Sequence, residues 1–583
     1  MPWAIFYRPS IQLGALAAYL REQGEIIVDC AHPYLDVAKA IGFDAYNEIS
    51  ASSWAGEALY SALLFPENRE NAQRLFARQV PDRKKEFTRL VNQLEETTTD
   101  WLARQDFSHH ALIGFSICFS QLLASLYCAS LIKKKYPDAA VVFGGSACTP
   151  QVGRGLLAAF PWLDYLITGE GEQAAADLLR HLTGAGPLPA QVLSRQQMRS
   201  TIPDNHSNPQ LDINTLPSPD YKDYFAELAG LGQPFVPELP IEFSRGCWWN
   251  KCSFCNLNQQ WRGYRWKSSA RVLAEVRLLT ERHQCLDFFF TDNALPPAES
   301  RLFFREMARE PGDYRFFAEI RAPGDMEECT LYQRGGLRSI QVGIEALSDS
   351  LLKKMRKGVT VMENIHAMKM AAALAIRLEG NLILEFPGSN EQEVRETLRA
   401  LAAALPYPPL KAASFFLGQG APVHAEPRQY GIRAITHHAN DRLLFPGPVL
   451  QCLDLLVKGY RGDRTRQKKL WRPVRRQIGL WQRFHQGRRH KKRPALELRD
   501  GGSFLLIRQE RPDQPALHHR LSGLSRQIYL ACDAPLPKKR LLARFKTIKE
   551  SQLSQFLDGL VRKGLLFTDG EAFLALAIRA GHK

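Results

Sequence analysis

The sequence predicts an α/β protein with two successive parallel β-sheets, followed by a C-terminal region of a different kind. Two series of short apolar runs alternate with helical patterns, one before residue 187 and one between residues 240 and 420. Such alternation is typical of parallel strands joined by crossover helices. The chain has 583 residues, which is enough for about three to four domains at roughly 150 residues each.

Residues 1–186 are predicted to form a doubly wound parallel sheet of the Rossmann or flavodoxin type. Apolar runs indicate buried strands at 25–31, 111–117, 140–145 and 165–172. Residues 57–105 are polar and favour helix, so we expect an inserted helical excursion there. Ligands of open α/β sheets bind at the carboxyl ends of the strands, where this sequence places Gly144 and Gly145. It has no GxGxxG pattern, so a nicotinamide cofactor is not supported.

The middle of the chain is predicted to be a linker followed by a partial (β/α)6 barrel. Nine prolines fall between Pro187 and Pro240, which indicates an extended linker over residues 187–239. Residues 240–420 then carry six strand candidates, at 240–246, 286–292, 315–322, 339–346, 381–388 and 411–418. In barrels of this kind the chemistry lies at the carboxyl ends of the strands.

The C-terminal third divides into a basic helical region, residues 421–494, and a winged-helix-like domain, residues 495–583. The net charge of the chain is +16, of which +14 lies between Lys458 and Arg493. This segment interleaves aromatic residues, so it fits a solvated helix whose aromatics dock on the barrel, a surface for an acidic peptide leader, or a contact with nucleic acid or a membrane surface. Residues 494–583 have no dense cationic run, which disfavours nucleic acid.

Three cysteines give the strongest chemical signal. Cys247, Cys252 and Cys255 lie within nine residues, directly after the first predicted barrel strand. Three thiolates can hold three irons of a four-iron cluster and leave the fourth iron open to a small molecule. The alternative is a zinc site made by Cys252 and Cys255 with His283 and Cys285, but that site leaves Cys247 unused and does not explain the barrel.

The other cysteines are scattered, so we expect buried reduced thiols. The sequence shows neither a secretory signal nor an apolar run long enough to span a membrane, so we expect a cytoplasmic protein.

Polar residues follow the later barrel strands and form a candidate binding site. They are Asp292 and Asn293 on the second strand, Glu319 and Arg321 on the third, Gln341, Glu345 and Ser348 on the fourth, and Glu385 on the fifth. Several polar side chains that converge on strand ends favour a ligand site over a purely structural network.

The cysteine pattern resembles the radical S-adenosylmethionine (radical SAM) superfamily. Its usual spacing is CX3CX2C, whereas this chain has CX4CX2C. The segments IGFSICFSQ, VVFGGSAC, LDYLITGEGE, PSPDYKDYF, SRGCWW and IQVGIEALSDSLLKKMRKGVT are similar to the class with an N-terminal cobalamin-binding-like domain. More closely, they resemble the radical SAM family that matures ribosomally made, post-translationally modified peptides (RiPPs).

The resemblance implies specific ligands for three cofactors. Cys247, Cys252 and Cys255 would hold a [4Fe-4S] cluster, and Phe254 would pack near the adenine of S-adenosylmethionine (AdoMet). The polar residues on the strand ends would hold the rest of AdoMet. Cobalamin would be lined by Ser116, Gln121, Gly144, Gly145 and Glu170. The DxHxxG pattern that supplies a lower axial histidine is absent, because Asp29 and His32 have the wrong spacing.

The resemblance also implies a reaction and partners. The expected function is cobalamin-dependent C-methylation of a ribosomally synthesised precursor peptide, with a reductant such as flavodoxin or ferredoxin. The alternatives are a cobalamin-independent radical modification of a peptide, such as epimerisation or cross-linking, methylation of a small natural product or lipid, and a zinc-containing nucleic-acid-binding protein.

Overall fold

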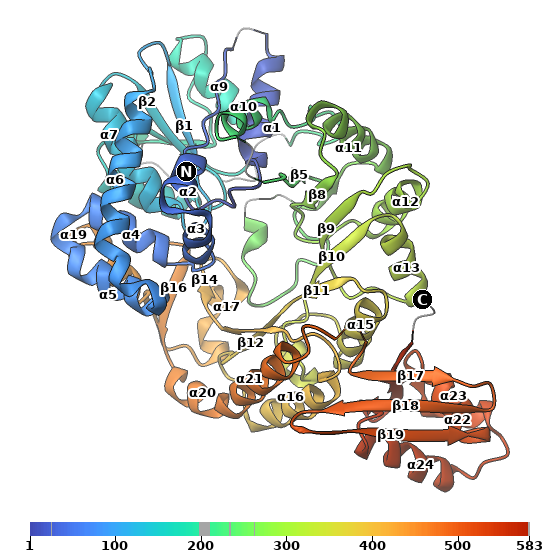
Figure 1. Ribbon diagram of the computed structural model, residues 1–583. Coiled ribbons are helices and arrows are strands. Elements are labelled where there is room, and N and C mark those ends of the chain that lie inside the picture. Colours follow the sequence, from blue (N-terminus) through green and yellow to red (C-terminus); the bar gives the residue numbers. More distant parts are fainter. Residues whose placement is uncertain are drawn as a thin grey trace.

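The structure is a computed structural model that describes residues 1–24, 26–197, 210–232, 235–259, 261, 263–491 and 493–580. An N-terminal α/β unit faces an arc of parallel strands, and the C-terminal strands and helices extend from one end of that arc (Figure 1). Among the described helices, none is both long and apolar enough to cross a membrane.

The N-terminal sheet has four strands in the order β1-β2-β3-β4. The first three are parallel and the fourth pairs antiparallel with the third. The strands are β1 (Leu112–Ser116), β2 (Ala140–Gly144), β3 (Tyr165–Ile167) and β4 (Val192–Ser194). The helices between and after the parallel strands are α7 (Leu122–Lys135), α8 (Pro150–Ala159) and α9 (Glu172–Leu182). Three of the four predicted strands are therefore confirmed.

The prediction of a strand at 25–31 is wrong for the described residues, because residues 26–31 form no strand. Their backbone groups bind side chains instead. Arg21 donates to the carbonyl of Val28 (Nε to O, 3.2 Å), and the amide of Cys30 donates to Asp223 (3.3 Å). Without that strand the described strands follow sequence order, so they show no reversal of the doubly wound kind.

The predicted helical excursion is present, and the predicted linker contains regular structure. The excursion consists of α4 (Ala55–Leu64), α5 (Arg69–Gln79) and α6 (Phe87–Ala103). The linker region holds β4 and α10 (Lys222–Gly230), while its residues 198–209, 233 and 234 lie outside the described residues. The hydroxyl of Tyr224 on α10 donates to the carbonyl of Phe6 at 2.9 Å, which fastens this segment to the N-terminal unit.

The central unit is a parallel sheet with helices on its outer side (Figure 1). Five strands lie in the order β11-β10-β9-β8-β5, and β12 pairs with β13. A parallel bridge between Glu345 and Leu382 joins the two groups. The strands are β5 (Leu239–Ile241), β8 (Asp287–Phe290), β9 (Arg315–Ile320), β10 (Leu337–Val342), β11 (Arg377–Glu379), β12 (Asn381–Leu384) and β13 (Lys411–Ser414). The helices are α11 (Ser269–His283), α12 (Pro297–Met307), α13 (Met326–Arg334), α14 (Asp349–Lys354), α15 (Val361–Ala373) and α16 (Glu391–Ala404).

The basic region docks on this unit through two buried tryptophans. It contains α20 (Arg464–Leu470) and α21 (Arg472–Gln486). The indole Nε1 of Trp471 donates to Ser389 Oγ, and that of Trp481 donates to the carbonyl of Tyr407, both at 2.9 Å. This agrees with the expectation that the aromatics pack on the barrel while the cations stay solvated. The preceding residues form β14 (Leu417–Gly418), β15 (Ala434–His437) and β16 (Val457–Arg461).

The C-terminal residues form two small sheets. The first has the order β19-β18-β17-β23, with β19 at its edge. Its strands are β17 (Leu496–Asp500), β18 (Phe504–Arg511), β19 (Gln514–Ser522) and β23 (Ile578–Arg579). The rest comprises α22 (Gly523–Ala531), β20 (Leu536–Pro537), α23 (Lys538–Arg544), α24 (Glu550–Arg562), β21 (Leu566–Thr568) and β22 (Ala572–Ala575). The hairpin predicted at Asp569 and Gly570 is confirmed.

Candidate cluster and cofactor site

The three cysteines of the predicted cluster lie on one loop that neighbouring segments hold in place. The loop follows β6 (Ser244–Arg245) and ends at a 3-10 turn, Leu257–Gln259. The amide of Ser253 donates to the carbonyl of Met355, and Trp249 Nε1 donates to that of Arg356, both at 2.9 Å. These bonds fix the loop to the segment after α14, so the positions of the thiols do not depend on the loop alone.

The three thiols fit a four-iron cluster. All three are free and half-buried. Burial, together with the charges of Cys252 and Cys247, raises the pKa of Cys255 to about 11, so the three sulfurs are close enough to interact. Each thiolate of a cubane binds a different iron, so three cluster ligands need not converge on one point.

The alternative zinc site is not assembled in the described part of the chain. There, no three His, Cys, Asp or Glu side chains surround a position for a single metal ion. A zinc ion needs four ligands at one point. His283 is instead stacked on Phe225, with ring centroids 4.3 Å apart, and Cys285 is buried.

Asp292 lies just past the end of β8, where the sequence placed it, and its carboxylate is buried. It accepts hydrogen bonds from the amide of Phe243 (3.0 Å) and from the hydroxyl of Ser244. Burial raises the pKa of Asp292 to about 7. This carboxylate therefore ties the first strand of the sheet to the second, and the half-buried Asn293 follows it.

Glu319 and Glu345 meet on the next two strands. Gln341 on β10 is in register with Glu319 on β9. Burial and the neighbouring charges of Glu345 and Asp292, opposed by Lys357, raise the pKa of Glu319 to about 7. Lys357 Nζ pairs with Glu345 Oε1 at 3.2 Å. The strand ends thus bring together three carboxylates and one ammonium group, an arrangement able to bind a zwitterionic ligand.

Arg321 connects these strand ends to the cysteine loop. Its Nη2 donates to the carbonyl of Lys357 at 2.7 Å, and its guanidinium lies 4.5 Å from the ring centroid of Trp249. Phe254 is partly buried against the core of the sheet. Both positions agree with a site that spans the cysteine loop and the third strand.

Two of the proposed AdoMet residues have other partners. Ser348 is fully buried and caps α14, because its hydroxyl accepts from the amide of Leu351 (3.1 Å) and donates to Glu396 (2.6 Å). Glu385 accepts from Arg475 of α21, Nη2 to Oε1 at 2.8 Å. Glu345 and Glu385 have positive φ angles of 57° and 65°, a strained conformation that proteins retain mostly at functional sites.

A buried arginine joins the carboxyl edges of the two sheets. Arg245 stands two residues before Cys247, and it pairs with Glu170 (2.8 Å) and Glu172 (2.5 Å) of the N-terminal unit and with Glu242 (2.8 Å). A second contact joins Thr149 Oγ1 to Gln419 Oε1 at 3.1 Å. The loops after β2 and β3 therefore face the residue after β14 and the cysteine loop, respectively.

The residues proposed for cobalamin are placed at this edge, but some are occupied by the protein itself. Gln121 is buried and donates to the carbonyl of Met1 at 2.8 Å. Glu170 is held by Arg245 and Arg265. A Cβ on Gly145 would lie 2.7 Å from the amide of Ile117, so this glycine allows two chain segments to approach rather than a ligand. Ser116 and Gly144 end β1 and β2.

His32 does not reach the edge. Its ring is buried beside Tyr34 and Tyr224, and its amide donates to Glu227 at 3.0 Å. This placement agrees with the absence of an axial-histidine pattern in the sequence.

Sequence reasoning missed Arg245, Glu172, Lys357 and Arg475. Arg245 and Glu172 belong to segments that carried the resemblance, SRGCWW and LDYLITGEGE, so their place next to Cys247 and Glu170 was a usable signal. Lys357 likewise belongs to such a segment, IQVGIEALSDSLLKKMRKGVT. Arg475 reaches the site only through tertiary structure, and no local pattern marks it.

Comparisons with known proteins agree with this geometry. Residues 241–401 match the Radical SAM superfamily. Hopanoid C-3 methylase of Methylococcus capsulatus is 29% identical over 311 residues, which are 51% of this chain and 57% of that protein. Anaerobic magnesium-protoporphyrin IX monomethyl ester cyclase of Cereibacter sphaeroides is 27% identical over 285 residues, 45% and 44% of the two chains. The chain spans about half the length of the curated relatives it matches.

The solved structures give the same fold. The radical S-adenosylmethionine methyltransferase TsrM from Kitasatospora setae aligns with a TM-score of 0.51 and 16% identity, over 66% of this chain and 80% of that one. At this identity the likeness shows the fold alone. Residues 241–401, which contain the cysteine loop, are therefore similar to the Radical SAM superfamily.

Proposed function

We propose that the protein is a cobalamin-dependent radical SAM methyltransferase that acts on a ribosomally synthesised peptide. The observation that carries the proposal is the contact between the two carboxyl edges, in which Arg245 beside the cysteine loop holds Glu170 and Glu172 of the first sheet. A cofactor at each edge would then face the same space. The proposal includes the partial (β/α)6 barrel and the winged-helix-like tail.

The cofactors, when bound, supply reductive cleavage of AdoMet and a transferable methyl group. The chain's own residues bind and orient them. Cys247, Cys252 and Cys255 would hold the cluster, while Glu319 and Glu345 would receive the amino group of AdoMet. Arg321 lies between the cysteine loop and the segment after α14, so we assign it the AdoMet carboxylate.

Cobalamin would lie against the ends of β1 and β2. A structural neighbour supports this cofactor, since the methyltransferase TsrM from Kitasatospora setae has also been solved with cobalamin and a [4Fe-4S] cluster bound. Ser116 and Gly144 remain the contact residues that we assign to it. Gln121 and Glu170 would act indirectly, by holding Met1 and Arg245 in place.

A peptide substrate is supported by the free edge of β19. This strand pairs only with β18 among the described strands, and Leu517 on it is 39% exposed. A free edge of this kind can bind an extended peptide by adding a strand to the sheet. A reductant such as flavodoxin or ferredoxin would complete the set of partners.

A second candidate is methylation of a lipid or another small natural product. The specific observation in its favour is the 29% identity with Hopanoid C-3 methylase. In this case the β19 edge would have no role in substrate binding, and its disruption would leave methyl transfer unchanged.

The test is anaerobic reconstitution of the whole chain with iron, sulfide and cobalamin. The expected result is about four irons per chain, bound cobalamin, and formation of 5′-deoxyadenosine after reduction with AdoMet. Mass spectrometry of candidate peptides should show the gain of one CH2. Loss of two hydrogens would contradict methylation and indicate cross-linking. A mass that is unchanged in H2O but rises in D2O, through uptake of deuterium from the solvent, would indicate epimerisation.

A further inference from the structure

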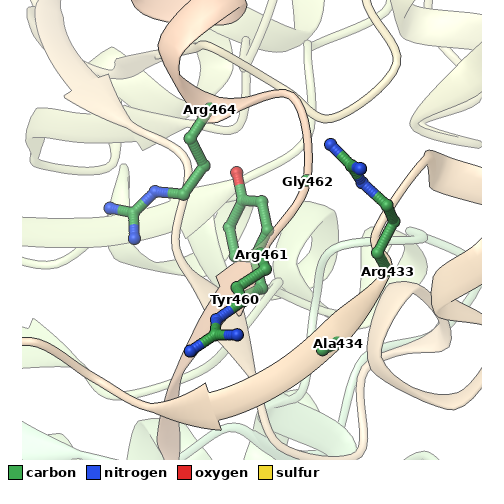
Figure 2. A pocket seen from close by; sticks show the side chains of 6 residues that line it. All are labelled: Arg433, Ala434, Tyr460, Arg461, Gly462 and Arg464. Atoms are coloured by element: carbon green, nitrogen blue, oxygen red, sulfur yellow. The ribbon is translucent and has the colours of Figure 1, made fainter.

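A pocket of about 530 Å³ outside the cluster site is lined by arginines. Its lining residues are Arg433, Ala434, Tyr460, Arg461, Gly462 and Arg464. Figure 2 shows Arg433 on one side and Arg461 and Arg464 on the other, with the ring of Tyr460 between them. The volume falls within the range of about 300–1,000 Å³ that small-molecule sites occupy.

The pocket is built on a rigid frame. The amide of Arg433 donates to the carbonyl of Arg461 at 2.8 Å, and β15 pairs with β16 directly beside it. A Cβ on Gly462 would lie 2.8 Å from the carbonyl oxygen of Gly431, so only glycine lets these two segments approach so closely. Tyr460 is buried beneath the guanidinium of Arg464, which lies 5.2 Å from its ring centroid.

Among the described residues, the three guanidiniums have no neutralising partner. In the part of the chain that the structure describes, no carboxylate pairs with Arg433, Arg461 or Arg464. The neighbouring Asp463 is used elsewhere, because its Oδ2 accepts from the amide of Gly388 (3.2 Å) and from Gln467 (2.6 Å). Unpaired arginines around one cavity repel one another. An oxyanion that accepts hydrogen bonds from their N–H groups relieves this repulsion.

On its inner side the pocket borders the second sheet. The ring of Tyr460 contacts that of Phe415 just past β13, with centroids 6.0 Å apart. The amide of Phe415 in turn donates to the carbonyl of Leu384, at the end of β12, at 2.9 Å. Glu385 is the next residue in the chain. The pocket is therefore one layer of side chains away from the strand ends of the candidate AdoMet site.

On its other side the pocket borders the first sheet. Burial, together with the charges of Arg464 and Arg78, lowers the pKa of His438 to about 4, so His438 lies within electrostatic reach of Arg464. His438 stacks on Trp54 with centroids 4.9 Å apart. Trp54 contacts Phe119, which lies in the loop after β1, at 5.5 Å. A chain of aromatic contacts thus connects the pocket to the loop after β1.

We propose that Arg433, Arg461 and Arg464 bind an oxyanion of the substrate, a carboxylate or a phosphate, and thereby anchor it beside the two cofactor edges. This inference rests on the proposed function, since it takes the space between the two edges as the place of reaction. It adds a chemical requirement, because the substrate must carry a negative group.

The test is isothermal titration calorimetry of the full chain with tripolyphosphate and with citrate, at low and at high salt. The Arg461→Gln/Arg464→Gln double variant should raise the dissociation constant of the tighter probe by about tenfold or more, because two charge-assisted contacts are lost. Arg428→Gln is the matched control, since Arg428 is an exposed arginine on a nearby 3-10 turn and does not line the pocket. The control should bind as the wild type does.

The outcomes separate the possible sources of the anion. Tight tripolyphosphate with weak citrate supports a phosphate ligand, and the reverse order supports a carboxylate. Equal binding by wild type and double variant, or no binding of either probe by the wild type, overturns the proposal. Cobalamin carries a phosphodiester of its own, so loss of cobalamin from the double variant overturns the assignment to substrate. Probe binding needs no turnover, so its result stands even if methyl transfer fails.

Discussion

The carboxyl edges of the two sheets differ in how their polar residues are used. At the first edge, Gln121 binds the carbonyl of Met1 and Glu170 binds two arginines, so the protein itself occupies them. At the second edge, Glu319 is half-buried beside Glu345 and Lys357. The first edge is thus largely closed by contacts within the chain. At the second edge Glu345 also has a partner, but no hydrogen bond or ion pair with a described residue engages the Glu319 carboxylate, which leaves it available to a ligand.

A polar residue at a strand end is therefore not sufficient evidence of a ligand contact. The loops after β2 and β3 meet a second unit, and their polar residues became the contacts that align the two edges. The cysteine loop has its own backbone bonds to the segment after α14, so its thiols stay available to iron.

Loss of a cluster ligand should have the largest effect. Cys252→Ala should abolish AdoMet cleavage, because two thiolates cannot hold a cubane in this loop. The measurement is the yield of 5′-deoxyadenosine from anaerobic, reduced protein, together with the iron content. Cys452→Ala is the matched control, because this thiol is exposed and lies on α19 (Gly447–Cys452), outside the cysteine loop. Cleavage that persists in Cys252→Ala would disprove the ligand assignment.

Removal of the arginine that joins the two edges comes next. Arg245→Gln leaves Glu170, Glu172 and Glu242 without their shared cation, and breaking a buried ion pair costs about 3–5 kcal/mol. We expect a lower thermal midpoint and a larger loss of methyl transfer than of AdoMet cleavage, since the first edge would no longer be aligned with the cluster.

The control for Arg245→Gln is Arg301→Gln, which also removes one arginine charge. Arg301 pairs with Glu328, and its side chain is 54% exposed. Exposed pairs contribute only about 0–1 kcal/mol. Equal losses of AdoMet cleavage and methyl transfer in Arg245→Gln would show that the arginine serves the cysteine loop rather than the alignment of the edges.

The sequence predicted the parallel elements of the fold well, because buried parallel strands are continuous apolar runs that helices separate. It failed at residues 26–31, where an equally apolar run stays irregular. The reason is tertiary, since Arg21, Asp223 and Glu227 satisfy the backbone groups that a neighbouring strand would otherwise bind.

The candidate site was predictable where one short segment supplies it, as with the three cysteines. It was less predictable where several strands contribute. Asp292, Glu319 and Glu345 were found from their positions at strand ends, whereas Ser348 proved to be a helix cap. Lys357 and Arg475 come from a loop and from the basic region, and only the folded chain brings them to the strand ends.

A buried carboxylate near the first edge predicts a pH dependence. Glu57 accepts from the amides of Leu122 and Leu123 at the start of α7, and burial raises its pKa from 4.5 to about 7. Between these two values the folded state keeps a proton that the unfolded state has released. Stability therefore falls as the pH rises through this window, by up to about 1.4 kcal/mol per pH unit for one group.

The measurement is hydrogen–deuterium exchange of peptides that cover α7 between pH 5 and pH 7, corrected for intrinsic exchange. Glu57→Gln should reduce the slope of the opening free energy of α7 against pH by the contribution of one titrating proton. Asp292→Asn applies the same change to a carboxylate with a similarly raised pKa at the second edge, and it should leave the α7 peptides unaffected. A pH dependence in α7 that survives Glu57→Gln would assign the titration to another group.

The smallest effect is expected for Arg475, which joins the basic region to the second edge. It donates to Glu385 and to Ser414 Oγ (2.7 Å), and its side chain is 37% exposed. Since partly exposed pairs contribute about 0–1 kcal/mol, Arg475→Gln should lower the free energy of unfolding by about 1 kcal/mol at most. The neighbouring Arg476→Gln is the control and should not lower it.

The KM for AdoMet tests whether Glu385 contacts AdoMet. If it binds only Arg475, KM stays within about threefold of the wild-type value. A larger rise in KM, without a matching loss of stability, would place Glu385 in the AdoMet site and make Arg475 its positioning residue.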